Sequence, residues 1–475
     1  MDCRRAVYLL AGALMAQTVA GAENAVLTVP TEVFRAAATD GDTARSAEPR
    51  PPLLPSLVHR LPPPTRTELM QLEGADDAVD EEGPRLPVQQ LGIGRDVAQL
   101  AGGALDAPTL LWQPTADGGQ AAALAVASEG AKALRVRLAI EGAPPGLEVR
   151  VYDAAGTAAT VVAVPAHQLS AAGEGSAELW TPTVPGDATT VELYLPAGTE
   201  PGELKVSIPV LSHLDADLTS GITSILVGLC PEHTDVACAA DEISDATRRA
   251  VARYVYTTAS GRTGGCTGTL LNDTDVATRI PYFLTAQHCL DNQHDASSME
   301  LYWFYERASC GGPDPERVTR QTGGATVLAG VGYEGPDTGV DHLLLRLNSD
   351  PPDGVAMAGW TTASLAAGDT AVGIHHPFGA LKKLVRQSVS GFTGRFSSSG
   401  SSHIVTHPDV NIQPGSSGSG LWKRIDGADY LVGVASTSSQ PYACSDVWNR
   451  YGRFDRFYPR VSRWLGPAAD VVELC

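Results

Sequence analysis

The chain of 475 residues lacks several features that define common protein classes. No uncharged apolar stretch reaches about 18 residues, so we expect no membrane-spanning helix and no membrane anchor. Basic residues are few, 34 against 54 acidic ones, and a net charge of −20 excludes a nucleic-acid backbone as an obvious partner. Aromatic residues make up only 6%, whereas 49 Gly and 33 Pro favour a loop-rich, all-β protein over a helical bundle.

Cysteine is absent from residues 4–229, and six of the eight cysteines lie between Cys230 and Cys444. Net negative charge is concentrated in the opposite part, because residues 1–218 hold 28 acidic and 14 basic side chains, a net −14 of the chain's −20. A cysteine-free, acidic first half and a cysteine-bearing second half predict two parts with different fates. In an oxidising compartment the second part would carry disulfides.

The first 22 residues have the pattern of a signal peptide. Arg4 and Arg5 form a basic start, residues 6–16 are an apolar core, and residues 20–22 are a small-residue cleavage site. Residues 1–22 therefore predict a secreted protein, located outside the cell or in the periplasm.

Two segments follow with different composition. Residues 23–90 are rich in Ala, Pro and acidic residues and are interpreted as a linker or loosely attached arm within a pro-region. Residues 91–218 contain runs that alternate apolar and polar side chains, at 134–140, 147–152 and 191–195, separated by Gly/Pro turns. This pattern predicts a β-rich domain of the sandwich type.

Three patterns in the last part, residues 219–475, combine the residue types of nucleophilic catalysis. His288 ends an apolar run, Asp341 opens another, and Ser417 lies between glycines in the loop Gly415–Gly418. Each alone has an ordinary reading as a loop histidine, a solvated strand-start carboxylate or a flexible loop. In the order His, Asp, Ser, with gaps of 53 and 76 residues, they predict a hydrolytic triad on a double β-barrel.

Metal binding and ester hydrolysis are weaker interpretations. His288, Cys289 and His294 match no usual zinc spacing, and a reduced thiolate is not expected in an exported protein. Ser417 is not in a G-x-S-x-G elbow, because position 419 is Ser, which disfavours a lipase or esterase. We expect no metal and no cofactor.

The T-A-x-H-C and G-x-S-G motifs resemble those of chymotrypsin-like serine peptidases. More narrowly, residues 222–466 are similar to the bacterial lysyl endopeptidases. The motifs that carry this resemblance are Gly265–Asn272, His288-Cys289, Ile374–Pro377, Gln413–Ser419 and Tyr451–Arg453. The resemblance implies an all-β, chymotrypsin-like double β-barrel preceded by a β-sandwich-like pro-region. It also implies a serine endopeptidase that acts on proteins or peptides.

The resemblance assigns a role to each motif residue. Ser417 would be the nucleophile, His288 the general base and Asp341 the residue that orients the imidazole. The backbone N–H groups of Gly415 and Ser417 would form the oxyanion hole. It further implies three disulfides: Cys230–Cys444, Cys238–Cys310 and Cys266–Cys289. Cys475 is left without an assigned partner.

Substrate specificity is where this chain departs from the family pattern. Relatives that cut after Lys carry an Asp just before the Tyr-Gly-Arg motif, and the matching residue here is Asn449. Asp446 is a candidate substitute, and Asn411 lies where trypsin-like enzymes hold their acid, six residues before the nucleophile. Since an amide gives no full charge to pair with Lys or Arg, we expect the basic preference to be weakened or lost.

The relatives are made as precursors, so residues 23 to about 218 are expected to be a propeptide that assists folding or covers the cleft. A retained binding module is the competing interpretation of this segment. For the whole chain, the alternative to a peptidase is a catalytically inactive, peptidase-like binding protein. We expect a monomer whose partners are its own propeptide and its peptide substrates.

Overall fold

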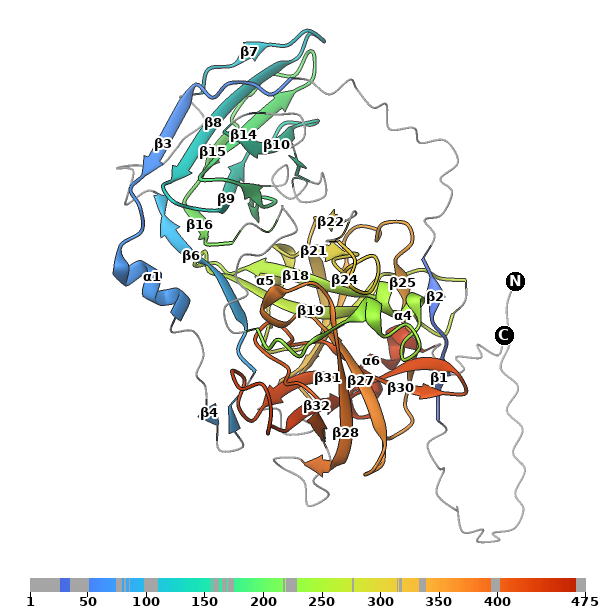
Figure 1. Cartoon of the computed structure of the whole chain (residues 1–475). Coiled ribbons are helices and arrows are strands. Elements are labelled where there is room, and N and C mark those ends of the chain that lie inside the picture. Colours follow the sequence, from blue (N-terminus) through green and yellow to red (C-terminus); the bar gives the residue numbers. More distant parts are fainter. Residues whose placement is uncertain are drawn as a thin grey trace, which may run out of the picture.

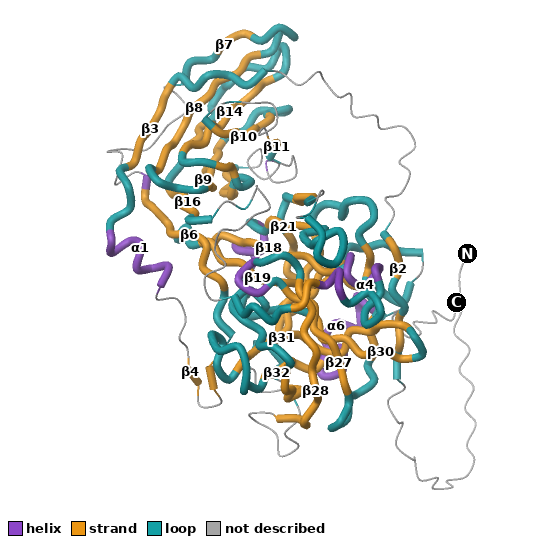
Figure 2. Tube along the Cα trace, in the orientation of Figure 1, coloured by secondary structure: helices purple, strands orange, loops and turns teal. Residues whose placement is uncertain are grey.

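The structure is a computed structural model, and almost all of its regular elements are strands (Figures 1 and 2). It describes residues 26–34, 51–73, 79–80, 83–84, 86–97, 110–154, 156, 162–164, 169, 175–216, 218, 229–275, 277–313, 315, 318–332, 339–393 and 402–466. The signal peptide and Cys475 lie outside these residues. Among them, no helix is both long and apolar enough to cross a membrane.

The amino-terminal region is a sandwich of two sheets (upper part of Figure 1). One sheet has the order β11-β10-β14-β8-β3, with β7 beside β8; the other contains β12, β9, β16 and β6, with β13 and β15 also on β9. Its strands are β3 (Leu57–Leu61), β6 (Gln89–Asp96), β7 (Gln113–Pro114), β8 (Gln120–Ser128), β9 (Ala133–Glu141), β10 (Glu148–Asp153), β11 (Val162–Ala163), β12 (Ser176–Trp180), β13 (Val184–Pro185), β14 (Ala188–Leu195), β15 (Lys205–Ser207) and β16 (Val210–Leu214).

Alternation of apolar side chains explains how the sandwich closes. On β9, Leu134, Val136, Leu138 and Ile140 are fully buried and join one aliphatic core with residues of the facing sheet. Side chains two apart on a strand point to the same face, so each sheet offers one apolar face to the other. The predicted strands at 134–140, 147–152 and 191–195 are confirmed as β9, β10 and β14.

The first barrel of the carboxy-terminal region is a sheet in which β19 pairs with β18 and β20, and β24 pairs with β20 and β23. Its elements are α4 (Asp245–Arg249), β18 (Val251–Thr257), β19 (Thr263–Leu271), β20 (Tyr282–Thr285), α5 (Gln293–Ser297), β21 (Glu300–Trp303), β22 (Thr319–Gln321), β23 (Ala325–Val331) and β24 (His342–Leu347). Every residue of β18, β19 and β20 is buried, which suits strands covered on both faces.

The second barrel closes on itself through the order β31-β30-β27-β28-β29-β32-β31. Its elements are β17 (Thr234–Asp235), η3 (Val236–Cys238), β25 (Ala356–Met357), β26 (Trp360–Thr361), β27 (Thr370–His375), η4 (Pro377–Gly379), β28 (Lys383–Thr393), β29 (His403–Pro408), β30 (Gly420–Ile425), β31 (Ala428–Ser438) and β32 (Asn449–Arg453). The helix α6 (Phe454–Leu465) follows β32 and buries Phe454, Phe457, Val461 and Leu465. The all-β double-barrel prediction is confirmed.

The strand β6 joins the sandwich to the first barrel. It pairs with β16 of the sandwich on one edge and with β19 of the barrel on the other, so one sheet runs through both regions (Figure 1). Gly94 of β6 is needed at this junction, because a Cβ there would lie 1.7 Å from the carbonyl oxygen of Ser260. The two regions are therefore continuous through backbone hydrogen bonds.

The described part of residues 23–90 differs from the loose linker that composition predicts. The strands β1 (Thr28–Val29) and β2 (Glu32–Val33) pair with β26 and β25, β3 belongs to the sandwich, and α1 (Arg66–Glu73) lies against β6. A short hairpin, β4 (Val79–Asp80) with β5 (Gly83–Pro84), precedes the buried Leu86. The composition argument counts only apolar surface that a segment buries by itself, whereas these pieces join sheets and cores formed elsewhere in the chain.

Candidate active site

His288 follows β20 directly and is held in place from two sides. The disulfide Cys266–Cys289 ties its loop to β19, as the resemblance implied, and the other two implied bridges, Cys230–Cys444 and Cys238–Cys310, are also formed. The backbone N–H of His288 donates to Asp341 Oδ1 at 2.9 Å. The ring Nδ1 lies 2.6 Å from Asp341 Oδ2, which fixes the imidazole orientation.

Asp341 is fully buried at the start of β24. The pairing of β20 with β24 sets Thr285 opposite Leu343, which brings the two loops that carry His288 and Asp341 together. Burial alone would raise the pKa of Asp341. The His288 imidazole and the hydrogen bonds from His288 and Ser436 outweigh it and hold the pKa below its ordinary value. Ser436 Oγ, from β31 of the second barrel, donates to Asp341 Oδ2 at 2.6 Å.

Ser417 lies in a loop clamped between the two barrels. Thr267 of β19 donates from its N–H to the Ser417 carbonyl and from its hydroxyl to the Gly415 carbonyl, at 2.9 and 2.8 Å. Gly418 donates to Ala435 of β31 at 3.0 Å. A Cβ on Gly418 would lie 2.1 Å from the Thr285 hydroxyl, so only glycine fits beside the serine.

The predicted catalytic residues are thus brought to one place, but Ser417 and His288 are not hydrogen-bonded to each other. Ser417 Oγ donates to the carbonyl oxygen of Leu86 at 3.3 Å, and both residues are fully buried. His288 Nε2 is buried and has no hydrogen-bond partner among the described residues. Ser417 and His288 are therefore the residue types of a nucleophile and its base, but the Ser417 hydroxyl proton is directed to the Leu86 carbonyl and not to His288.

The three residues named for specificity occupy different environments. Asn411 is buried and its amide is fully used, since Nδ2 donates to the Gln440 and Ala443 carbonyls and Oδ1 accepts from Ser438. Asn449 is buried, and neither atom of its amide has a hydrogen-bond partner within the described ranges. Asp446 is exposed. Of these three positions, none supplies a buried carboxylate.

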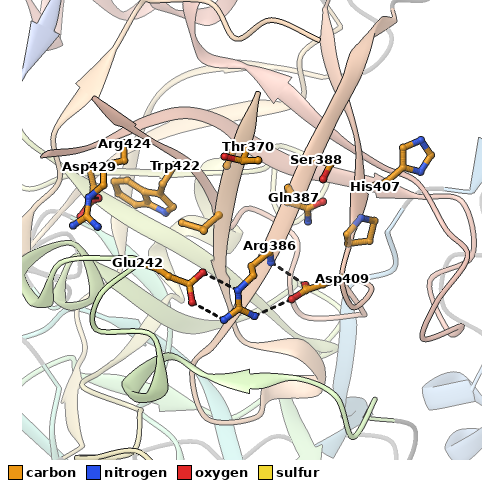
Figure 3. A pocket seen from close by; sticks show the side chains of 13 residues that line it. Glu242, Thr370, Arg386, Gln387, Ser388, His407, Asp409, Trp422, Arg424 and Asp429 are labelled. Atoms are coloured by element: carbon orange, nitrogen blue, oxygen red, sulfur yellow. Dashed lines mark hydrogen bonds and ion pairs between the residues drawn. The ribbon is translucent and has the colours of Figure 1, made fainter. Parts of the chain in front are cut away.

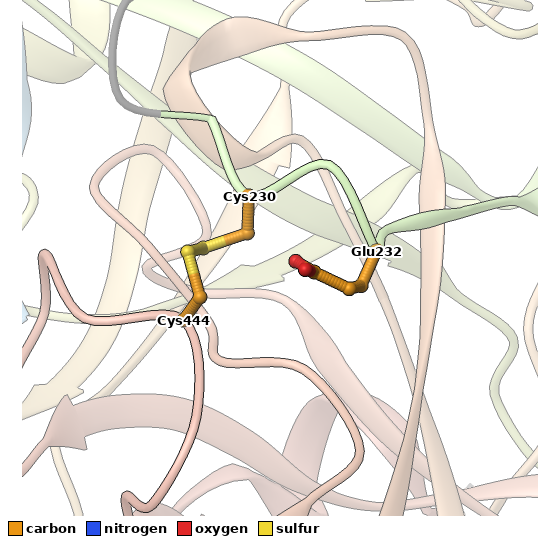
Figure 4. A group of neighbouring side chains, drawn as sticks. All are labelled: Cys230, Glu232 and Cys444. Carbon is orange, nitrogen blue, oxygen red and sulfur yellow. A yellow bond between two sulfur atoms is a disulfide. The ribbon is translucent and has the colours of Figure 1, made fainter.

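Two further clusters are structural. A pocket of about 570 Å³ beside the second barrel is lined by residues of β27, β28 and β30, and none of the three predicted catalytic residues lines it. Figure 3 shows Arg386 at its centre, ion-paired with both Glu242 and Asp409. Cys230, Cys444 and Glu232 lie close enough to resemble a metal site, but the two sulfurs are bonded to each other (Figure 4) and offer no thiolate.

Sequence reasoning missed two residues at the site. Ser436 is one of several hydroxyl residues at the end of β31, and nothing in that run singles it out. Leu86 lies more than 300 residues before Ser417, in a segment whose composition predicted a linker, and only the fold brings the two together.

The two β-barrels form the fold of the chymotrypsin-like class of serine peptidases. Two family models match the chain: the lysyl endopeptidase N-terminal domain over residues 60–215 and the lysyl endopeptidase C-terminal domain over residues 228–448. A protein named lysyl endopeptidase from Pseudomonas aeruginosa is 30% identical over 471 residues, which is 97% of each chain. The chain belongs to the lysyl endopeptidase family.

Solved structures also match the chain in part. The HtrA-type protease AlgW with a tripeptide is 18% identical with a TM-score of 0.31, over 46% of this chain and 60% of that one. The structure of Deg5 is 17% identical with a TM-score of 0.31, over 46% of this chain and 92% of that one.

Proposed function

We propose that this serine endopeptidase is exported as a precursor and cleaves peptide bonds through His288, Asp341 and Ser417. The observation that carries the proposal is the 2.6 Å contact between His288 Nδ1 and the buried Asp341 carboxylate, with the Ser417 loop clamped beside it. The signal-peptide pattern of residues 1–22 and the three disulfides support export to an oxidising compartment.

The chemistry follows from the position of each group. Ser417 Oγ attacks the scissile carbonyl while its proton passes to His288 Nε2, and the imidazolium then protonates the leaving amine. Asp341 keeps Nδ1 protonated and stabilises the imidazolium, because its carboxylate is ionised and accepts both hydrogen bonds from His288. Water hydrolyses the resulting ester and restores the serine.

The backbone N–H groups of Gly415 and Ser417 are proposed as the oxyanion hole. Neither donates a hydrogen bond to any described residue, so both are available to a developing oxyanion. Gly415 has a φ of +89°, a conformation that orients the loop backbone and that other residues adopt only with strain. One such donor is typically worth about 3–4 kcal/mol of transition-state stabilisation.

The residue before the scissile bond, P1, is proposed to be uncharged. The positions that hold an acid in relatives specific for basic residues are Asn411 and Asn449, and Asp446 is exposed. Leu86, whose carbonyl contacts Ser417, joins a buried apolar cluster of the second barrel with Ile412 and Ala435. An apolar side chain of leucine size therefore suits this pocket better than a cation.

The first test is digestion of a diverse peptide library by the secreted product of the full-length gene, with Ser417→Ala as the control. We expect cleavage by the wild type alone, after uncharged residues. Failure of a correctly processed wild type, checked by intact mass, to cleave any peptide would favour the inactive binding protein instead.

Specificity is tested by two matched amide-to-acid changes. Asn449→Asp should raise the ratio of Lys to Leu cleavage at least about 10-fold, because it adds one carboxylate without breaking a hydrogen bond. Asn411→Asp removes the donor that serves two carbonyls and should lower stability without a comparable switch. An unchanged Lys/Leu ratio in Asn449→Asp would contradict the assignment of Asn449 to the pocket.

A further inference from the structure

The chain passes through its own candidate active site. The Leu86 N–H donates to the carbonyl oxygen of Ser436 at 3.3 Å, and the Leu86 carbonyl accepts from Ser417 Oγ at 3.3 Å. Upstream, β5 lies beside β31 of the second barrel, and downstream, β6 pairs antiparallel with β19 of the first barrel. Residues 86–92 therefore run from the second barrel to the first with one peptide carbonyl at the nucleophile, which is the path a bound peptide substrate would take.

This segment excludes competing substrates. Leu86, Pro87, Val88 and Gln89 are all buried, and Ser417 has no exposed surface. Because β6 is held between β16 and β19, the segment is anchored in a sheet on its downstream side. An anchored segment has a high effective concentration at the site, so a free peptide must displace it to reach Ser417.

The contact at Ser417 is not productive for acyl transfer. Attack requires the Ser417 hydroxyl proton to pass to His288 Nε2, but that hydroxyl donates to the Leu86 carbonyl and Nε2 has no partner among the described residues. The Leu86 oxygen also receives no hydrogen bond from the N–H groups of Gly415 and Ser417 within that part of the chain. The carbonyl is thus at the nucleophile but outside the proposed oxyanion hole.

The residue after Leu86 adds a chemical obstacle. Pro87 makes the Leu86–Pro87 amide tertiary, so its nitrogen carries a ring carbon in place of a hydrogen. To be protonated by His288, the leaving nitrogen would have to turn its lone pair towards the imidazole, and the ring hinders that turn. Proline also biases Leu86 towards an extended conformation, which is the conformation of a peptide bound along a strand. The same residue thus favours binding of the segment and disfavours its cleavage.

We propose that residues 86–92 are a built-in, substrate-like inhibitor, in which Leu86 occupies the P1 position and Pro87 prevents cleavage of the segment. This inference rests on the proposed function, because it requires Ser417 to be the nucleophile. It identifies the part of the amino-terminal half that keeps the precursor inactive, and it separates inhibition by this segment from any role of the sandwich in folding.

The first experiment asks whether removing the proline turns the inhibitor into a substrate. In purified full-length Pro87→Ala, Ser417 Oγ bonds to the Leu86 carbonyl carbon while the bond to the nitrogen of residue 87 breaks and that nitrogen takes the proton from His288. Water then releases the Leu86 carboxylate. We expect intact-mass spectrometry to show two products that sum to the precursor plus one water.

The matched control is Pro201→Ala, a half-buried proline in a turn of the sandwich. Wild type and Pro201→Ala should stay uncut between residues 86 and 87, and Ser417→Ala added to Pro87→Ala should abolish the cut. A folded Pro87→Ala precursor that labels at Ser417 and yet stays uncut at this bond would overturn the proposal.

The second experiment measures access to Ser417 with a fluorophosphonate probe. The full-length Leu86→Gly precursor loses the buried P1 side chain and should label at least 10-fold faster than the wild-type precursor. Equal labelling rates for the wild-type precursor, Leu86→Gly and the processed secreted product would contradict the proposal that this segment inhibits the enzyme. If no form labels, including the processed product, the proposed function fails rather than this inference.

Discussion

The sandwich and the two barrels both bury apolar cores, but they are held together by different means. The sandwich core is aliphatic, made of Leu, Val, Ile and Ala side chains, and the region contains no cysteine. The largest core of the carboxy-terminal region adds large aromatic side chains such as Trp303, Trp360 and Phe283, and this region carries three disulfides. Of the two regions, therefore, the described residues show covalent cross-links only in the barrels.

The contact between the two regions includes hydrogen bonds that water can replace. Besides the pairing of β6, Arg135 of the sandwich is fully buried and donates to the Thr257 hydroxyl and the Ser298 carbonyl of the first barrel. Hydrogen bonds of this kind can be replaced by water when the regions separate, whereas disulfides cannot. The difference suits the proposed precursor, in which the sandwich would stay in place first and leave afterwards without unfolding the enzyme.

The largest effect should come from removing the orienting carboxylate, and it should leave the sandwich unchanged. In the processed enzyme, Asp341→Asn should lower kcat about 10⁴-fold, because an amide favours the wrong imidazole tautomer. Peptide cleavage measures the loss, and Asp426→Asn, an exposed residue in the turn between β30 and β31, is the control. A loss of less than about 10-fold in Asp341→Asn would remove this residue from the triad.

The next largest effect should separate the stabilities of the two regions. Replacing Cys266 and Cys289 together by Ala opens a 23-residue loop and should destabilise the first barrel by about 3 kcal/mol. Amide exchange, read separately for strands of each region, should rise in β19 and β20 but not in β10 and β14. Equal acceleration in both would mean that the sandwich depends on the barrel for its stability.

The sequence predicts those features of the fold and the site that a short stretch of neighbouring residues reveals. His288, Asp341 and Ser417 each lie in a short motif, and their order points to one type of fold, so the chemistry could be proposed without coordinates. The alternation on β9 likewise reveals a strand that buries one face. These signals need only a few neighbouring residues.

The path of residues 86–92 has no such signal. Leu86-Pro87 is one of many Pro-containing pairs in an acidic, Pro-rich stretch, and its meaning arises from a contact with a residue 331 positions later. The partner of Asp341, Ser436, is 95 positions away and is missed for the same reason. Strand pairing between distant segments is set by complementary edges and by burial, which a single segment does not display.

A smaller effect should loosen the attachment of the sandwich without changing either core. Arg135→Met should weaken the contact by about 2 kcal/mol, because it leaves the Ser298 carbonyl and the Thr257 hydroxyl short of a partner in a buried place. Faster amide exchange of β6 in the Ser417→Ala precursor measures this opening. The control is Arg137→Met, which removes a more exposed donor to the Ala259 carbonyl and should cost less than about 1 kcal/mol. Equal acceleration of β6 amide exchange in both variants would show that the burial of Arg135 does not strengthen the contact between the two regions.

The smallest effect should be an acid-dependent loosening that begins in the sandwich at β16. Burial, with a contribution from the Arg95 guanidinium, lowers the pKa of His213 from 6.5 to about 4, and its Nδ1 lies 2.8 Å from the Ser128 hydroxyl. When a histidine has a lower pKa in the folded state than in the unfolded state, the folded state loses stability as the pH falls below about 6.5. The reason is that the unfolded state then binds a proton that the folded state does not bind. Asp215 and Glu68 oppose this trend by favouring the charged ring.

Because His213 pairs across to Ile93 of β6, its protonation should ease release of the strand that follows the inhibitory segment. Between pH 7 and pH 5.5 we expect about 1 kcal/mol of β6 stability to be lost, and His213→Gln should remove that pH dependence. Amide exchange of β6 across this range, in the Ser417→Ala precursor, measures both. The control is His59→Gln on β3, a half-buried histidine of the same sandwich. If His213→Gln retains the full pH dependence, histidines of the barrels such as His403, whose pKa burial also lowers to about 4, would be responsible, and acid would then loosen both regions alike.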